Sequence, residues 1–278
     1  MFKFKKVYIL AVTIILIFTA GCTLFLPKKP AVSVHLTLGN PSNANTVEPN
    51  NYLMVKKEYA LSYNRDKGIP NWVSWELNKS WLGTAPRSNN FRPDDTLVEG
   101  WYRVIPSDYT RSGYDKGHMT PSADRSNNAE DNAATFLMTN IIPQAPDNNQ
   151  GYWARLEDYG RTLAQSGKEL YIISGSYGQK ETIALKKVAV PARIFKIIVV
   201  AEPGIGVNSI NESTRVIAVD TPNVDGNREA DWREFLTSVD AIEKKTGYDF
   251  LSDIKPSIQQ VIEAQIDQSR KINKVRKK

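Results

Sequence analysis

Short apolar stretches with strand-like and helix-like periodicity follow one another along the chain from about residue 51. Five stretches rich in β-branched or aromatic residues predict strands: Tyr59–Tyr63, Trp72–Leu77, Leu170–Ile173, Phe195–Val200 and Arg215–Val219. Helical segments lie between some of them but do not alternate with them regularly. This arrangement predicts an α+β fold in which helices flank a central antiparallel sheet.

Three other segments repeat apolar residues with the spacing of an amphipathic helix. Two of them are Tyr152–Gln165 and Trp232–Lys245. The third is a last helix with an apolar stripe from Ile258 to Ile266, which we interpret as core packing.

The first 21 residues have the pattern of a secretory signal. Three lysines precede the apolar run Val7–Ala20, which is shorter than the ~20 residues of a membrane-spanning helix. Cys22 follows Ala-Gly directly, an order that resembles the lipobox in which the cysteine is acylated. We expect a lipoprotein-type signal over residues 1–21, lipidation of Cys22 and a place in the cell envelope outside the cytoplasm. A secreted protein and an uncleaved membrane anchor are the alternatives.

Composition divides the rest of the chain into a tether, one domain and a tail. Residues 22–50 hold four prolines among polar residues, which predicts a tether, and His35 within it is interpreted as a linker residue without a role. Residues 51–268 suffice for one domain. Residues 269–278 form a tail with six basic and no acidic residues. Because Cys22 is the only cysteine, no disulfide is expected.

The formal net charge of +6 does not by itself indicate a nucleic-acid partner. Without the three lysines of the signal the charge falls to +3, and without the basic tail as well it is −3. A basic tail is usually a solvated terminus. The case for any such partner has to come from a local site.

His118 is the only histidine of the predicted domain, in the segment Tyr114–Arg125. A neutral imidazole can accept a proton near pH 7, although a lone histidine is more often a packed or surface residue. The domain has no second histidine and no cysteine, which excludes a histidine-based structural zinc site. A Ser–His–Asp triad is weakly supported, because no serine lies in a Gly-x-Ser-x-Gly context.

A second polar segment precedes and enters the helix predicted over 152–165. Asn149 stands where that helix would begin, so helix capping is its structural interpretation, and an oxygen ligand for a hydrated Mg²⁺ is its functional one. Glu157 and Arg161 are four residues apart on one helix face. That pair could equally be a surface ion pair of small energy.

The motifs of both segments resemble one family. Asp-Lys-Gly-His at 115–118, Thr-Asn-Ile-Ile-Pro-Gln at 139–144 and Asn-Gln-Gly-x-Trp-x-x-Leu-Glu at 149–157 are similar to the DNA/RNA non-specific endonucleases. These are ββα-metal (His-Me finger) nucleases of the Serratia nuclease and endonuclease G type, and the closest likeness is to a secreted cyanobacterial member. The resemblance extends from about Tyr59 to Ile266 through several ordered motifs.

The resemblance implies a catalytic site with these roles. His118 would be the general base that activates water, and Asn149 would be the direct protein ligand of one Mg²⁺ or Mn²⁺ ion. Glu157 would contact that ion through a water molecule. Arg161 and Arg87 would grip the phosphate, because a guanidinium meets two phosphate oxygens at once.

Three supporting residues follow from the same resemblance. Asp115 and Lys116 precede the histidine, and Asn140 is expected to shape the active-site loop. Lys116 stands where the family usually has Arg, and lysine lacks the bidentate guanidinium. A surface-tethered nucleic-acid-binding lipoprotein with weakened or lost catalysis is therefore the alternative to an active enzyme.

The family implies substrates and partners as well. We expect cleavage of single- and double-stranded DNA and RNA to products with 5′-phosphates. Lack of sequence preference would follow from a site that touches phosphate and sugar but not base edges. An inhibitor protein is a further candidate partner, and the oligomeric state is left open.

Overall fold

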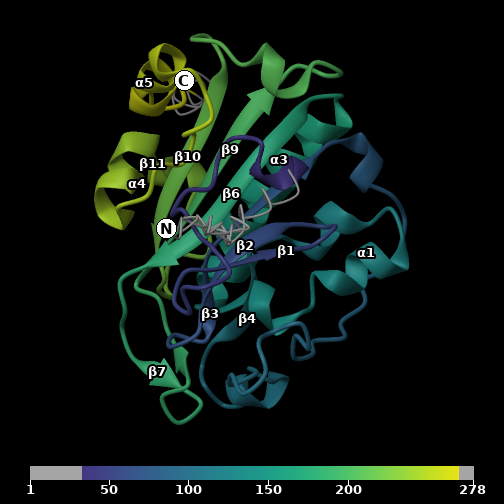
Figure 1. Ribbon diagram of the computed structural model, residues 1–278, viewed down its shortest axis with the longest axis vertical. Coiled ribbons are helices and arrows are strands. Elements are labelled where there is room, and N and C mark those ends of the chain that lie inside the picture. The colour runs from purple at the N-terminus through teal and green to yellow at the C-terminus, as the bar shows by residue number, and fades with distance from the viewer. Residues whose placement is uncertain (1–32, 269–278) are drawn as a thin grey trace, which may run out of the picture. The chain divides into compact units, whose positions relative to one another are not determined.

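A seven-stranded antiparallel sheet lies at the centre of the structure, a computed structural model that describes residues 33–268 (Figure 1). Its strand order is β1-β2-β3-β6-β9-β10-β11. The strands are β1 (Tyr52–Val55), β2 (Ala60–Asn64), β3 (Ile69–Leu77), β6 (Glu169–Tyr177), β9 (Arg193–Ala201), β10 (Arg215–Pro222) and β11 (Leu236–Thr237). The expected α+β fold around an antiparallel sheet is therefore confirmed.

Two short two-stranded sheets accompany the main sheet. One joins β4 (Asp115–His118) to β5 (Ile141–Gln144), and the other joins β7 (Thr182–Ile183) to β8 (Val188–Ala189). The helices are α1 (Ala129–Ala134), α2 (Pro146–Asn148), the π-helical turn η6 (Asn149–Trp153), α3 (Ala154–Gln165), α4 (Val239–Thr246) and α5 (Pro256–Ala264). The remaining helical elements are single 3₁₀ turns.

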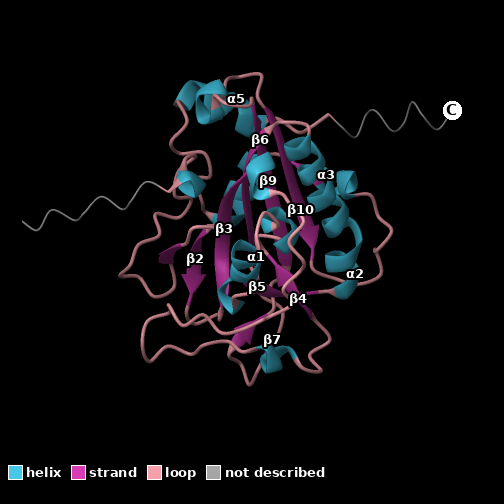
Figure 2. Cartoon of the chain, turned by 90° about the vertical axis from the view of Figure 1, so that its right-hand side faces the viewer, coloured by secondary structure: helices cyan, strands magenta, loops and turns pink. Residues whose placement is uncertain are grey.

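Each face of the main sheet carries its own hydrophobic core, because successive side chains of a strand point to opposite faces. Along β9, Ile194 and Ile198 join the core beneath α3, whereas Phe195, Ile197 and Val199 join the core beneath α4 and α5. Figure 1 shows α4 and α5 on one side of the sheet, and Figure 2 shows α2, α3 and β4 grouped together. The predicted active-site segments therefore share the face that α3 covers.

All five predicted strands are present, and the helix expected over Tyr152–Gln165 is present as the end of η6 followed by α3. The helix expected over Trp232–Lys245 is wrong in its first half. Asp231 caps a single 3₁₀ turn, Leu236–Thr237 pairs with β10, and the α-helix begins only after Ser238, whose hydroxyl caps it. Strand pairing here takes precedence over helical spacing.

The last helix follows the expected stripe only in part. Ile262 is fully buried between the sheet and α4, but α5 ends at Ala264 and Ile266 is half exposed beyond it. Proline at the first position and an extended residue after Ala264 set these limits.

The tether predicted for residues 22–50 is wrong for the part that the structure describes. His35 is buried: its Nε2 lies 2.8 Å from the carbonyl oxygen of Lys57, and its Nδ1 accepts a hydrogen bond from the backbone nitrogen of Glu76. Leu38 is also buried against the sheet. Long-range hydrogen bonds therefore order a segment whose composition is that of a linker.

The predicted signal, Cys22 and the basic tail lie outside the described residues. Within residues 33–268, no helix has both the length and the apolar character that crossing a bilayer requires.

Candidate active site

A ββα unit carries the two segments that the sequence singles out. β4 and β5 pair antiparallel, with His118 opposite Ile141 and Asp115 opposite Gln144, and the chain then enters α2, η6 and α3 (Figure 2). Gly117 fits between the strands because it has no side chain: a Cβ there would lie 2.6 Å from Cβ of Gln144. Glycine next to the histidine is thus a packing requirement of this unit.

His118 stands at the end of β4 in an aromatic surrounding. Its ring centroid lies 4.8 Å from that of Phe136 and 5.3 Å from that of Phe91. Its Nε2 is buried and has no hydrogen-bond partner among the described residues. Burial, with a smaller contribution from the charge of Arg87, lowers the pKa of His118 to about 3. The imidazole is therefore neutral at pH 7 in the free protein.

Asn149 is not the N-cap of α3, as its structural interpretation would require; that position is Trp153. It has helical backbone angles, and its backbone nitrogen donates to the carbonyl oxygen of Ala145. Its side-chain Nδ2 donates to Oδ2 of Asp115 at 2.9 Å, and Nε2 of Gln150 donates to the same oxygen at 2.7 Å. Asp115 thereby fixes the carboxamide of Asn149 to the strand that carries His118.

The amide oxygen of Asn149 is left available by this arrangement. No hydrogen bond to it is formed by any residue in the range 33–268. One neutral oxygen next to a carboxylate suits a hard divalent cation that keeps most of its water. A π-helical turn with a kink at Gly151 presents this residue, and such turns are frequent at functional sites.

Glu157 and Arg161 do not form the surface ion pair that their spacing allows. Oε1 of Glu157 lies 3.0 Å from Nζ of Lys196, whose side chain is 2% exposed. Arg161 instead pairs with the buried Asp124 at 2.8 Å and with Asp158. The two charged groups of α3 are thus each held by a partner outside the helix.

Burial and nearby charges shift the pKa values of Glu157 and Arg161 in opposite directions. Burial raises the pKa of Glu157, and the nearby charges of Lys196 and Arg161 oppose that rise. Burial alone would lower the pKa of Arg161. The carboxylates of Asp124 and Glu157 outweigh this effect, and the pKa is raised. Arg161 is therefore a permanent cation.

Arg87 and Arg161 both line a hollow of about 360 Å³. Nη1 of Arg87 donates to Oγ of Ser122 at 2.6 Å, and its guanidinium lies 4.9 Å from the centroid of Phe136, the ring that also packs on His118. Burial lowers the pKa of Arg87. Two arginines that border one hollow, one of them packed on the same ring as the imidazole, can bind an anion there.

Asn140 and Lys116 complete the set of predicted residues. The side chain of Asn140 accepts from the backbone nitrogen of Thr120 and donates to the carbonyl oxygens of Thr120 and Thr135, each at 2.9 Å. It therefore fixes the backbone of Thr120, two residues after His118, to that of Thr135. Nζ of Lys116 lies 5.1 Å from the ring centroid of Phe91, and none of the described carboxylates pairs with it.

Lys196 and Asp124 are the charged residues of this site to which the sequence assigns no role. Lys196 interrupts the apolar stretch Phe195–Val200, and a lysine in a buried strand is itself a signal that a charged partner is near. Asp124 accepts from Arg161 and from Nε1 of Trp75 at 3.0 Å. Nothing in the local pattern indicates that second contact.

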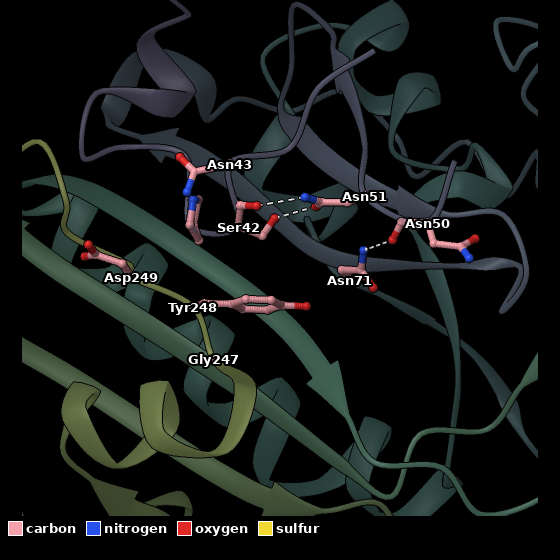
Figure 3. A pocket seen from close by; sticks show the side chains of 9 residues that line it. Ser42, Asn43, Asn50, Asn51, Asn71, Gly247, Tyr248 and Asp249 are labelled. Carbon is pink, nitrogen blue, oxygen red and sulfur yellow. Dashed lines mark hydrogen bonds between the residues drawn. The ribbon is translucent and has the colours of Figure 1, made fainter. Parts of the chain in front are cut away.

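A separate hollow of about 340 Å³ lies between the N-terminal segment and the turn after α4 (Figure 3). Asparagine and serine side chains from residues 42–51 form one wall, and Tyr248 and Asp249 form another. None of the predicted catalytic residues lines it. The ββα unit therefore remains the candidate active site.

His118, Asn149 and Arg161 thus belong to one ββα unit, and Arg87 packs from a preceding loop on the ring that also contacts His118. Residues 38–257 match the model of the DNA/RNA non-specific endonuclease family. The chain belongs to this family, and it is an endonuclease.

Similar proteins support this membership. The chain is 56% identical over 242 residues to a protein named nuclease from Nostoc, covering 86% of this chain and 88% of that protein. It is 32% identical to the mitochondrial nuclease of Saccharomyces cerevisiae, over 74% of this chain and 67% of that protein. The expected likeness to a cyanobacterial member is thus confirmed.

A solved structure shares the fold. It is that of an EndoG/EndoGI complex, with a TM-score of 0.69 at 24% sequence identity, covering 82% of this chain and 94% of the matched one. This likeness supports the ββα-metal nuclease fold assigned from the sequence.

Proposed function

We propose that this endonuclease hydrolyses DNA and RNA without sequence preference, with His118 as general base and one hydrated Mg²⁺ or Mn²⁺ ion at Asn149. The observation that carries the proposal is the hydrogen bond from Asn149 to Asp115, three residues before His118 on β4. It connects the turn that carries Asn149 to the strand that carries His118.

His118 takes a proton from the water molecule that attacks phosphorus. An imidazole with a pKa of about 3 is a weak base in the free protein. A phosphodiester that binds between the base and Arg87 brings a negative charge, which raises the pKa of the imidazole and offsets the charge of Arg87. The base therefore becomes stronger when substrate is bound.

The arginines position the phosphate. Arg161 donates a hydrogen bond to Asp124, and Arg87 donates one to Ser122. These bonds fix the two guanidinium groups and leave other N–H groups to donate to phosphate oxygens. The hollow that both arginines line would receive the phosphate backbone of the nucleic acid. Contacts of this kind read the backbone and leave base edges untouched.

The ion at Asn149 would neutralise the charge that grows on the phosphate and the leaving 3′-oxygen. Glu157 would hold one of the waters of the hydrated ion, and Asp115 would keep the amide oxygen of Asn149 directed toward it. Magnesium and manganese suit this donor set because it offers oxygen only.

A plasmid assay with purified residues 33–268 tests the proposal. We expect degradation that needs Mg²⁺ and that EDTA stops. His118→Ala should reduce the rate about 1,000-fold. Cleavage should also slow as salt rises, because phosphate contacts release counterions. Retention of DNA without cutting would support the binding protein with lost catalysis instead.

We also propose that the chain is exported and lipidated at Cys22, which would hold the enzyme at a membrane of the cell envelope. Incorporation of labelled fatty acid that Cys22→Ser abolishes tests this proposal, and an unlabelled wild-type protein in the medium would favour secretion. A protein inhibitor is a further proposal. It rests on the solved structure that shares the fold, an EndoG/EndoGI complex in which EndoG is inhibited.

A further inference from the structure

Lys196 is a charged residue in a row of buried apolar side chains. It lies between Ile194 and Ile198 on the face of β9 that α3 covers, and it is 2% exposed. An isolated ammonium group is costly to bury, so it needs a partner that repays the lost hydration. Its partner is the carboxylate of Glu157, 3.0 Å away.

Two tryptophans complete the surroundings of the ammonium group. Nζ of Lys196 lies 4.4 Å from the ring centroid of Trp153 and 5.5 Å from that of Trp75. Both distances are in the range of a cation–π interaction, which is stronger when the cation is desolvated. The group is thus fixed in position by one carboxylate and two rings.

These contacts reach both elements of the proposed metal site. Trp153 is the last residue of η6, the turn that begins with Asn149, and Glu157 lies on the first turn of α3. Trp75 in turn donates to Asp124, the partner of Arg161. Lys196, on a strand of the main sheet, therefore contacts both the turn η6 and the helix α3 that carry the proposed metal site.

We infer that Lys196 is a positioning residue for Glu157, and this inference rests on the proposed function. By holding Oε1 of Glu157, Lys196 fixes the carboxylate in one orientation. Oε2 accepts no hydrogen bond from the residues that the structure describes, and it is left to order a water of the hydrated ion. Loss of Lys196 should weaken metal binding without loss of Asn149.

A double-mutant cycle of Lys196→Met and Glu157→Gln tests the inference, with Mn²⁺ binding to the protein measured by electron paramagnetic resonance. We expect Lys196→Met to raise the Kd for Mn²⁺ about 10-fold or more. In the Glu157→Gln background the same change should alter the Kd less than about 2-fold, because the group through which Lys196 acts is gone. Lys168→Met, which removes a partly exposed lysine paired with Glu202, is the matched control and should leave the Kd unchanged.

Two results would overturn the inference: an unchanged Kd in Lys196→Met, or equal effects of that substitution in both backgrounds. If Lys196→Met alone does not fold, recovery of folding in the double variant supports the coupling, because both charges are then removed. Failure of both to fold would show a packing role only. If instead the wild-type protein neither binds Mn²⁺ nor cuts DNA, it is the proposed function that fails.

Discussion

Asn149 and Asp115 are 34 residues apart in the chain, yet the amide of one donates to the carboxylate of the other at 2.9 Å. The contact ties the π-helical turn to β4. It also decides which atom of the amide is free, since Nδ2 is used and the oxygen is not. The orientation of the Asn149 side-chain amide thus leaves its oxygen free for the proposed metal ion.

Asp115→Ala should therefore raise the Mg²⁺ concentration for half-maximal cleavage about 10-fold, because Asn149 loses the partner that orients it. The metal titration of plasmid cleavage measures this effect. Gln150→Ala is the control, since Gln150 donates to the same carboxylate but its oxygen is not a proposed ligand. Equal titration midpoints for wild type and Asp115→Ala would contradict the orienting role.

Gly117→Ala should destabilise the domain by about 2–4 kcal/mol, because the new methyl group overlaps Cβ and Oε1 of Gln144. Urea unfolding followed by tryptophan fluorescence measures the change. Gly160→Ala is the matched control: a Cβ there meets Ile198 and Leu170 at an ordinary 3.9 Å, and alanine favours the helix. It should be neutral or stabilising. A Gly117→Ala protein as stable as wild type would rule out the packing requirement.

The pH dependence of stability should reveal the neutral His118. Its pKa is about 3 in the folded protein and ~6.5 in the unfolded chain, so its contribution is complete above pH 6.5 and is lost as the pH falls towards 3. Relative to wild type, His118→Gln should gain about 2 kcal/mol in unfolding free energy between pH 7 and pH 5. Parallel pH curves for the two proteins, obtained from urea titrations, would contradict a buried neutral imidazole.

Ionisation of Glu263 should make stability depend on pH in the opposite direction. Its carboxylate lies within 4.8 Å of those of Asp240 and Glu243, and burial, with the charge of Glu243, raises its pKa to about 8. The folded state therefore disfavours ionisation, and stability is lost as the pH rises from the unfolded value near 4.5 towards 8.

Glu263→Gln removes this loss and should stabilise the protein by roughly 1 kcal/mol at pH 8, but hardly at pH 4.5. Melting temperatures at the two pH values measure the difference. Glu212→Gln, on an exposed loop, should have no effect at either pH. A Glu263→Gln protein with the same melting temperature as wild type at pH 8 would contradict the raised pKa of Glu263.

The sequence by itself determined five of the seven strands of the main sheet and, through its motifs, the family with its ββα order. Alternating and β-branched stretches can be recognised from neighbours in the chain alone, without the fold. The same local reasoning failed where two patterns competed, as at Leu236–Thr237, whose helical spacing yields to pairing with β10.

Only the tertiary structure decided which side chains meet. His35 is part of the core because Lys57 and Glu76 bind both of its ring nitrogens, although its surrounding composition is that of a linker. Glu157 pairs with Lys196 and not with Arg161, because the register of β9 beneath α3 sets that contact. Local periodicity fixes which face a residue presents, whereas strand register and packing between distant segments fix its partner.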